Sequence, residues 1–137
     1  MANAAAGYNQ YLRSKIMTAS KPELTLMLYD GAIKFANMAV MAIEKKDIPG
    51  AHNAIMRTTA IIEEFRVTLD HKYEVAKDFD NVYVYVLQRL ADANIKKDVE
   101  ILEEVLGHLR TMRDTWKEAM QKAGVAGAGP NLSRASA

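Results

Sequence analysis

The residues that could carry acid–base or metal chemistry are few in this sequence. The chain has 137 residues, three histidines and no cysteine. The lack of cysteine excludes disulfides, thiolate metal sites and cysteine nucleophiles. Helical two-metal sites place a glutamate three residues before a histidine ligand, and none of the three histidines has one there. We therefore expect no catalytic residue, no metal and no cofactor, and a protein that is not an enzyme.

The acidic residues near each other in sequence suggest solvated surfaces. Glu104 and His108 are four residues apart and could share a ligand in principle. The simpler interpretation is an exposed helical pair that contributes roughly a few tenths of a kcal/mol. The adjacent pairs Glu63-Glu64 and Glu103-Glu104 would diverge on a helix, so we do not interpret them as acid/base couples.

Charge and hydropathy argue against two further classes of protein, those that bind nucleic acid and those that enter a membrane. Residues 21–121 hold 14 basic and 17 acidic residues, a net charge of −3 that matches phosphate backbones poorly, so we expect no nucleic-acid partner. The start has neither a basic stretch nor an apolar stretch typical of a secretory signal, and an apolar run such as Val82–Leu87 is too short to span a membrane. We expect no membrane insertion and a cytosolic protein, or one translocated without a cleaved signal.

Four segments show helical periodicity and would have to position any site. The first begins at the capping box Ser20–Glu23 and should end near 44–46. The second follows Asp47, the third covers about 78–94, and the fourth runs from Asp98 to Gly124. The third contains a Val/Tyr run at 82–86 that favours a strand, but its i, i+3, i+4 spacing and the lack of a hairpin partner predict a helix.

Long helices with short connections predict an all-α fold, an antiparallel up-down four-helix bundle. We expect three parts: an N-terminal amphipathic tail or short helix at 1–19, the bundle at 20–123, and a disordered Gly/Ala-rich tail at 124–137.

The helices carry more apolar residues than one core requires. In the first helix the face that we assign to the core includes Leu24, Met27, Leu28, Phe35 and Met38. The surplus predicts an external groove for an apolar helix or extended peptide, although a wide core with ordinary exposed residues remains open. The candidate groove residues fall beside, or widen, the best stripe of each helix: Tyr29, Ile33, Ile55, Ile62 and Tyr83.

The N-terminal tail has its own apolar stripe, formed by Tyr8, Tyr11, Leu12 and Ile16. One interpretation is that the tail covers the groove when no partner is bound. The alternatives are a tail that packs permanently and a tail that frays.

Three blocks in order resemble the flagellar export chaperone family FliS. They are Thr18–Ile33, which contains Leu-Tyr-Asp-Gly-Ala at 28–32, then Ala93–Val105, then Leu109–Met120 with Arg-Asp-Thr-Trp-Lys-Glu at 113–118. The family's middle helix is also matched at Glu44–Ile48 and Ile61–Glu64. The resemblance covers about residues 8–122.

The resemblance implies a cytosolic bundle that binds the C-terminal segment of flagellin, prevents its early polymerisation and helps deliver it to the flagellar type III export gate. It also implies that the N-terminal segment lies over part of the binding surface until flagellin displaces it. Two alternatives remain: a dimeric structural or adaptor bundle that uses the spare apolar strips for self-association, and a metal-binding bundle.

Overall fold

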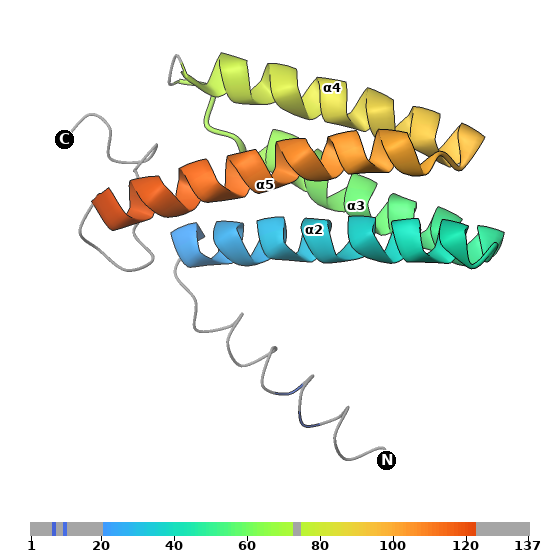
Figure 1. Cartoon of the computed structure of the whole chain (residues 1–137). Coiled ribbons are helices and arrows are strands. Elements are labelled where there is room, and N and C mark those ends of the chain that lie inside the picture. The colour runs from blue at the N-terminus through green and yellow to red at the C-terminus, as the bar shows by residue number, and fades with distance from the viewer. Residues whose placement is uncertain (1–6, 8–9, 11–20, 73–74, 123–137) are drawn as a thin grey trace.

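The computed structural model describes residues 7, 10, 21–72 and 75–122. Within them lie four helices: α2 (Lys21–Glu44), α3 (Ile48–Thr68), α4 (Val75–Lys96) and α5 (Val99–Lys122). Figure 1 shows them side by side as a bundle, which confirms the predicted all-α fold. The predicted tail residues Tyr8, Tyr11, Leu12 and Ile16, the capping residue Ser20 and the tail at 124–137 lie outside the described residues.

The two short connections share one local design. Lys46 and Lys97 adopt positive φ angles of 62° and 50°, which end α2 and α4. The aspartate that follows each lysine then caps the next helix. Asp47 Oδ1 accepts from the Gly50 N–H at 3.0 Å, and Asp98 Oδ1 accepts from the Glu100 N–H at 2.8 Å. These turns reverse the chain within two or three residues, so consecutive helices are antiparallel.

Helix α4 is longer than predicted at both ends. It begins at Val75 and ends at Lys96, whereas the sequence pattern indicated about 78–94. The first turn extends because Ala76 is buried against the bundle. The Val/Tyr run is helical as expected, with Tyr83 and Val86 buried three residues apart.

The helices form a closed ring of neighbours. Each packs against the next in sequence, and α5 returns to pack against α2. Helix α2 packs extensively on α3 and α5, whereas α4 packs less extensively on the same two helices. Ion pairs tie α4 on both sides: Arg66 Nε of α3 lies 2.7 Å from Asp80 Oδ1, and Arg89 Nε lies 2.9 Å from Glu104 Oε1 of α5.

The core runs along the bundle axis and includes fully buried aliphatic residues from α3, α4 and α5. Thr58 is a buried polar residue in this core, and its hydroxyl donates to the Ala54 carbonyl oxygen at 3.0 Å. The largest fully buried aliphatic side chains are Ile55, Ile62, Leu90, Leu102, Leu106 and Leu109.

The predicted core face of α2 is wrong. The buried stripe is Tyr29, Ala32, Ile33, Ala36, Ala39 and Val40. The face predicted to be the core, including Leu28 and Phe35, is only partly buried. The three buried alanines explain why this stripe faces the core, because small side chains let α2 approach α3 and α5 closely. The bulkier stripe therefore lies beside the core and is only partly buried, with Leu28 packed against the core.

Candidate functional site

The five residues predicted to form an external groove lie inside the bundle. Their exposed fractions are 2% for Tyr29, 8% for Ile33, 1% for Ile55, 0% for Ile62 and 5% for Tyr83. Their expected exposure is therefore wrong, because each belongs to the buried stripe of its helix. Tyr29 and Tyr83 do line a cavity at one end of the bundle. Contact between any of the five and a partner stays a prediction.

The surplus apolar surface instead lies on the outer side of α2. We define the outer α2 face as Leu24, Met27, Leu28, Gly31, Phe35, Met38 and Ala42, which recur at helical spacing. All are partly buried except Met38, which is 42% exposed. By length and composition α2 could cross a membrane, a test that a core helix also meets. Yet only 33% of that apolar window is buried inside the protein.

Helix α3 borders the outer α2 face. A side chain at Gly31 would meet Ile61 Cδ1 at 3.6 Å, an ordinary contact, so the two helices are close there. One turn further along, the guanidinium carbon of Arg57 lies 5.4 Å from the centre of the Phe35 ring. Through this cation–π contact, the positive charge of Arg57 lies at the border of the apolar strip on α2. A strip with such a border can accept an amphipathic helix.

A second apolar feature lies between α3 and α4. Its lining includes Ile55, Met56, Leu87 and Ile95. Met56 is 48% exposed and Ile95 is 82% exposed. Neither residue has a periodic signal in the sequence, because Met56, within α3, and Ile95, in the last turn of α4, are each single exposed apolar residues. This α3–α4 groove is a further surface on which an apolar segment could pack.

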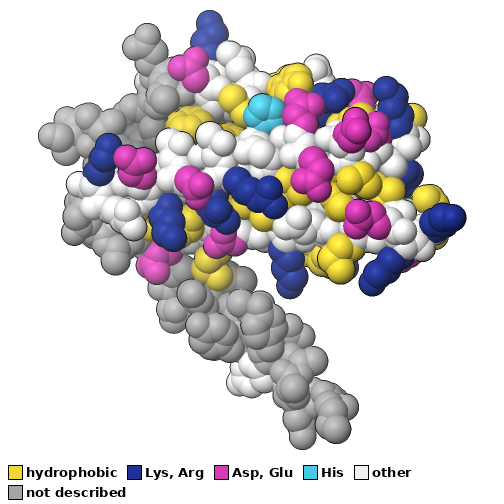
Figure 2. Space-filling model, viewed as in Figure 1, with side chains coloured by type: hydrophobic (Ala, Val, Ile, Leu, Met, Phe, Trp, Pro, Cys, Tyr) yellow, Lys and Arg dark blue, Asp and Glu magenta, His cyan; other side chains and the backbone are white. Residues whose placement is uncertain are grey.

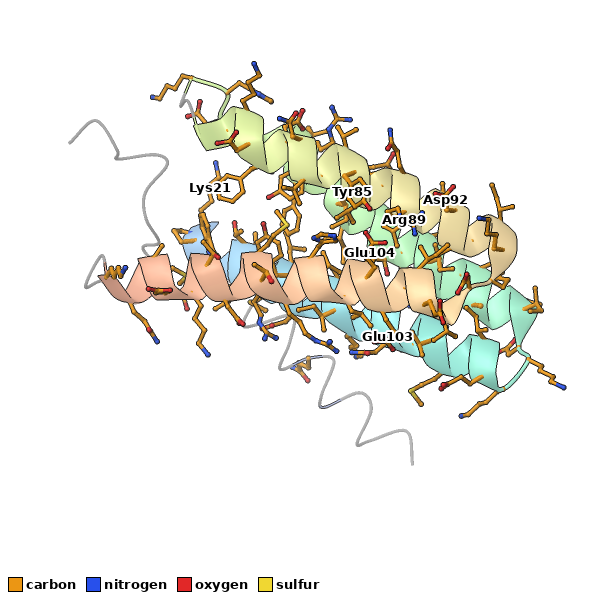
Figure 3. The ribbon with its side chains drawn as sticks, turned by 45° about the horizontal axis from the view of Figure 1, so that its top comes forward. Lys21, Tyr85, Arg89, Asp92, Glu103 and Glu104 are labelled. Atoms are coloured by element: carbon orange, nitrogen blue, oxygen red, sulfur yellow. The ribbon has the colours of Figure 1, made fainter. Side chains whose placement is uncertain are left out.

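A polar network joins α4 to α5 on another side (Figure 3). Glu104 accepts from the Tyr85 hydroxyl and from Arg89 Nε at 2.9 Å, and His108 Nε2 lies 3.4 Å from it. Arg89 also donates to Asp92 at 3.0 Å. The hydrogen bond from Tyr85, with those from Arg89 and His108, holds the pKa of Glu104 below its usual value. The expected Glu104–His108 pair is therefore one part of a network that fastens two helices.

This network predicts a pH dependence of stability. The pKa of Glu104 is lowered in the folded protein, so its ionised form stabilises the fold above the ordinary glutamate pKa. That contribution is lost as the pH falls through the lowered pKa. The Glu104→Gln variant should therefore lose less stability than the wild type between pH 6 and about pH 3. Urea denaturation across this range measures the difference, and parallel losses would show that the network has no net effect.

No metal centre is apparent among residues 21–72 and 75–122. This part of the chain contains no group of three or more His, Asp or Glu side chains placed to hold an ion. The view in Figure 2 shows hydrophobic side chains as separate patches between charged ones, so that side presents no large apolar surface.

Comparison with known proteins identifies the family. Residues 3–123 match the family model described as flagellar protein FliS. The flagellar secretion chaperone FliS of Bacillus subtilis is 39% identical over 114 residues, which cover 83% of this chain and 86% of that protein. The FliS proteins of Escherichia coli and Salmonella typhimurium are 32% and 31% identical, covering 85% and 87% of this chain and 91% and 93% of theirs. These relatives are named as chaperones, and the chain belongs to the FliS family of flagellar secretion chaperones.

Proposed function

We propose that the protein binds the C-terminal segment of flagellin in the cytosol. It keeps that segment from polymerising early and helps deliver flagellin to the flagellar export gate. Membership of the secretion chaperone family supports the role. The outer α2 face is the observation that supports the mechanism, because it presents a long apolar strip that the bundle buries only in part.

The energetics of the proposed complex favour a large apolar contact. A disordered segment that folds on binding loses conformational entropy, which costs roughly 2–5 kcal/mol. Apolar burial yields about 25 cal/mol per Å², so the contact must be extensive to leave a tight complex. The outer α2 face and the α3–α4 groove lie on different sides of α3, so a wrapping segment could use both. The methionines on these surfaces, Met27, Met38 and Met56, can adapt to an imperfect partner.

Seeded polymerisation of flagellin tests the chaperone role. Purified cognate flagellin is mixed with short filament seeds, and filament growth is followed by light scattering. An equimolar amount of this protein should suppress growth, since the polymerising segment is covered. An unrelated helical bundle at the same concentration is the control. Unchanged growth at concentrations at which the two proteins co-elute would reject the protective role.

The complex should persist in moderate salt. The part of the chain from 21 to 121 has a net charge of only −3, and the proposed contact is apolar, so screening of charge should matter little. Titration calorimetry at 50 mM and 300 mM NaCl should give affinities that agree within about threefold. A loss of more than tenfold would show that charge dominates the contact.

We further propose that the N-terminal tail competes with flagellin. The stripe of Tyr8, Tyr11, Leu12 and Ile16 supports this from the sequence alone. If the tail covers the flagellin surface, only molecules with an open tail can bind. The apparent affinity is then the intrinsic affinity multiplied by the fraction of open molecules. Deletion of residues 1–17 should therefore tighten binding of a flagellin C-terminal peptide and increase self-association of the free protein. Weaker binding by a folded truncated protein would make the tail part of the flagellin contact instead.

A further inference from the structure

A cavity of about 150 Å³ opens at the end of the bundle where α2 begins and α3 ends. The first turns of α4 and the last turns of α5 complete it. An engineered apolar cavity of similar volume in another protein holds a benzene molecule, so this one can accept a single bulky side chain. Its wall includes five aromatic side chains, Tyr29, Phe65, Phe79, Tyr83 and Trp116, and its other lining residues include Leu69 and the charged Lys21 and Asp70.

The cavity wall is held in place by contacts among its own members. The rings of Tyr29 and Phe65 have centroids 4.4 Å apart, and those of Phe65 and Tyr83 are 5.6 Å apart. The Trp116 indole N–H donates to the Pro22 carbonyl oxygen at 3.1 Å, which ties α5 to the first turn of α2. The cavity is therefore formed before any partner arrives.

A buried tyrosine pair adds a hydrogen-bond donor to the wall of this cavity. The hydroxyls of Tyr29 and Tyr83 lie 2.7 Å apart, and one donates to the other. Two hydroxyls carry two hydrogens, so one hydrogen remains after that bond. Among the described residues no other hydrogen bond engages either hydroxyl. Both side chains are more than nine-tenths buried, and a buried donor without an acceptor is destabilising.

The tyrosine pair stays protonated throughout the physiological range. Burial raises the pKa of Tyr29 far above its ordinary value, and the neighbouring Tyr83 raises it further. Burial also raises the pKa of Tyr83. Among the described residues this remaining hydrogen has no acceptor, so a partner group that completes the site would carry one.

We propose that this end cavity receives one bulky apolar side chain of flagellin, and that a main-chain carbonyl beside that side chain accepts the remaining tyrosine hydrogen. The inference rests on the proposed function and adds a specific subsite to it. The carbonyl would come from the end of a helical stretch, where the last carbonyls have no partner within the helix. An apolar side chain and an adjacent carbonyl match both the aromatic wall and the single donor.

The first test fills the cavity. Thr25 lines it from α2, and its hydroxyl donates to the Lys21 carbonyl oxygen at 3.2 Å. The Thr25→Phe variant should lower the affinity for purified flagellin at least about tenfold in titration calorimetry. Thr111→Phe is the matched control, because it makes the same exchange at an exposed position of α5 that does not line the cavity, and it should bind like the wild type.

The second test removes the donor and does not depend on the first variant folding. The double variant Tyr29→Phe, Tyr83→Phe has no hydroxyl, and circular dichroism should show a melting temperature at or above that of the wild type. Its affinity for flagellin should fall about three- to tenfold. Each single variant keeps one hydroxyl and its hydrogen, so each should bind almost as well as the wild type.

Each contrary outcome has a distinct meaning. If the wild type does not bind flagellin at all, the proposed function itself fails. If the wild type binds and Thr25→Phe binds equally well, the cavity is not a flagellin subsite. Tighter binding by Thr25→Phe would show that this chain's own N-terminal segment occupies the cavity, which also overturns the inference. A double variant with wild-type affinity would reject the hydrogen bond.

Discussion

Aspartate in place of Ile62 should unfold the bundle. The Ile62 side chain of α3 is 0% exposed, and a carboxylate there would be buried among the apolar residues of the core. An uncompensated buried charge costs about 3–5 kcal/mol, which approaches the whole stability of a typical domain. Circular dichroism should show a loss of helix at 25 °C, or a urea midpoint far below that of the wild type.

Ile62→Val is the matched control, because it removes one methyl group and should cost only about 1 kcal/mol. For the same reason, aspartate should also unfold the bundle at the other four buried positions that the sequence suggested as contacts: Tyr29, Ile33, Ile55 and Tyr83. A folded Ile62→Asp protein that has lost flagellin binding would contradict the structure and return Ile62 to the surface.

Aspartate in place of Met38 should leave the protein folded but weaken flagellin binding at least about tenfold. Met38 is 42% exposed on the outer α2 face, so in the free protein a carboxylate there remains in contact with water. In the complex the same carboxylate would be buried against apolar atoms, which is unfavourable. Calorimetric titration of flagellin measures the loss, and the melting temperature reports the fold.

Gln88→Asp on α4 is the control for Met38→Asp. Gln88 is exposed and outside the outer α2 face, and the substitution adds the same charge within a helix. It should change binding by less than about twofold. Equal effects of the two variants would indicate a general influence of negative charge, and no effect of either would remove the outer α2 face from the contact.

The starts of α3 and α5 could be predicted from the sequence because the capping residues of these helices are local features. Asp47 and Asp98 each cap the helix that follows, and such capping residues can be recognised from a few neighbouring positions. The run at 82–86 was also assigned correctly, since the apolar spacing of the longer segment outweighed the strand propensity of its valines.

The orientation of α2 could not be predicted in the same way. It carries two apolar stripes, and the bulkier one, with Leu28 and Phe35, has the stronger hydrophobic signal. The structure buries the stripe with Ala32, Ala36 and Ala39 instead. Which stripe of α2 is buried depends on how closely the helix backbones approach each other. The periodicity of a single helix contains no information on that distance.

The end cavity was beyond sequence reasoning for a related reason. Its wall combines Pro22, Phe65, Phe79 and Trp116 from four different helices. The Trp116–Pro22 hydrogen bond joins residues 94 positions apart. Only the packed bundle brings such positions together, and no pattern within one segment indicates the pair formed by Tyr29 and Tyr83.

The most direct test of binding to the C-terminal segment compares two forms of the cognate flagellin. Size-exclusion chromatography with light scattering is run on this protein mixed with full-length flagellin, and with flagellin that lacks its C-terminal segment. We predict a complex with the full-length form and two separate peaks with the truncated form. A complex with both forms, or with neither, would contradict the claim that this protein is a chaperone for the C-terminal segment of flagellin.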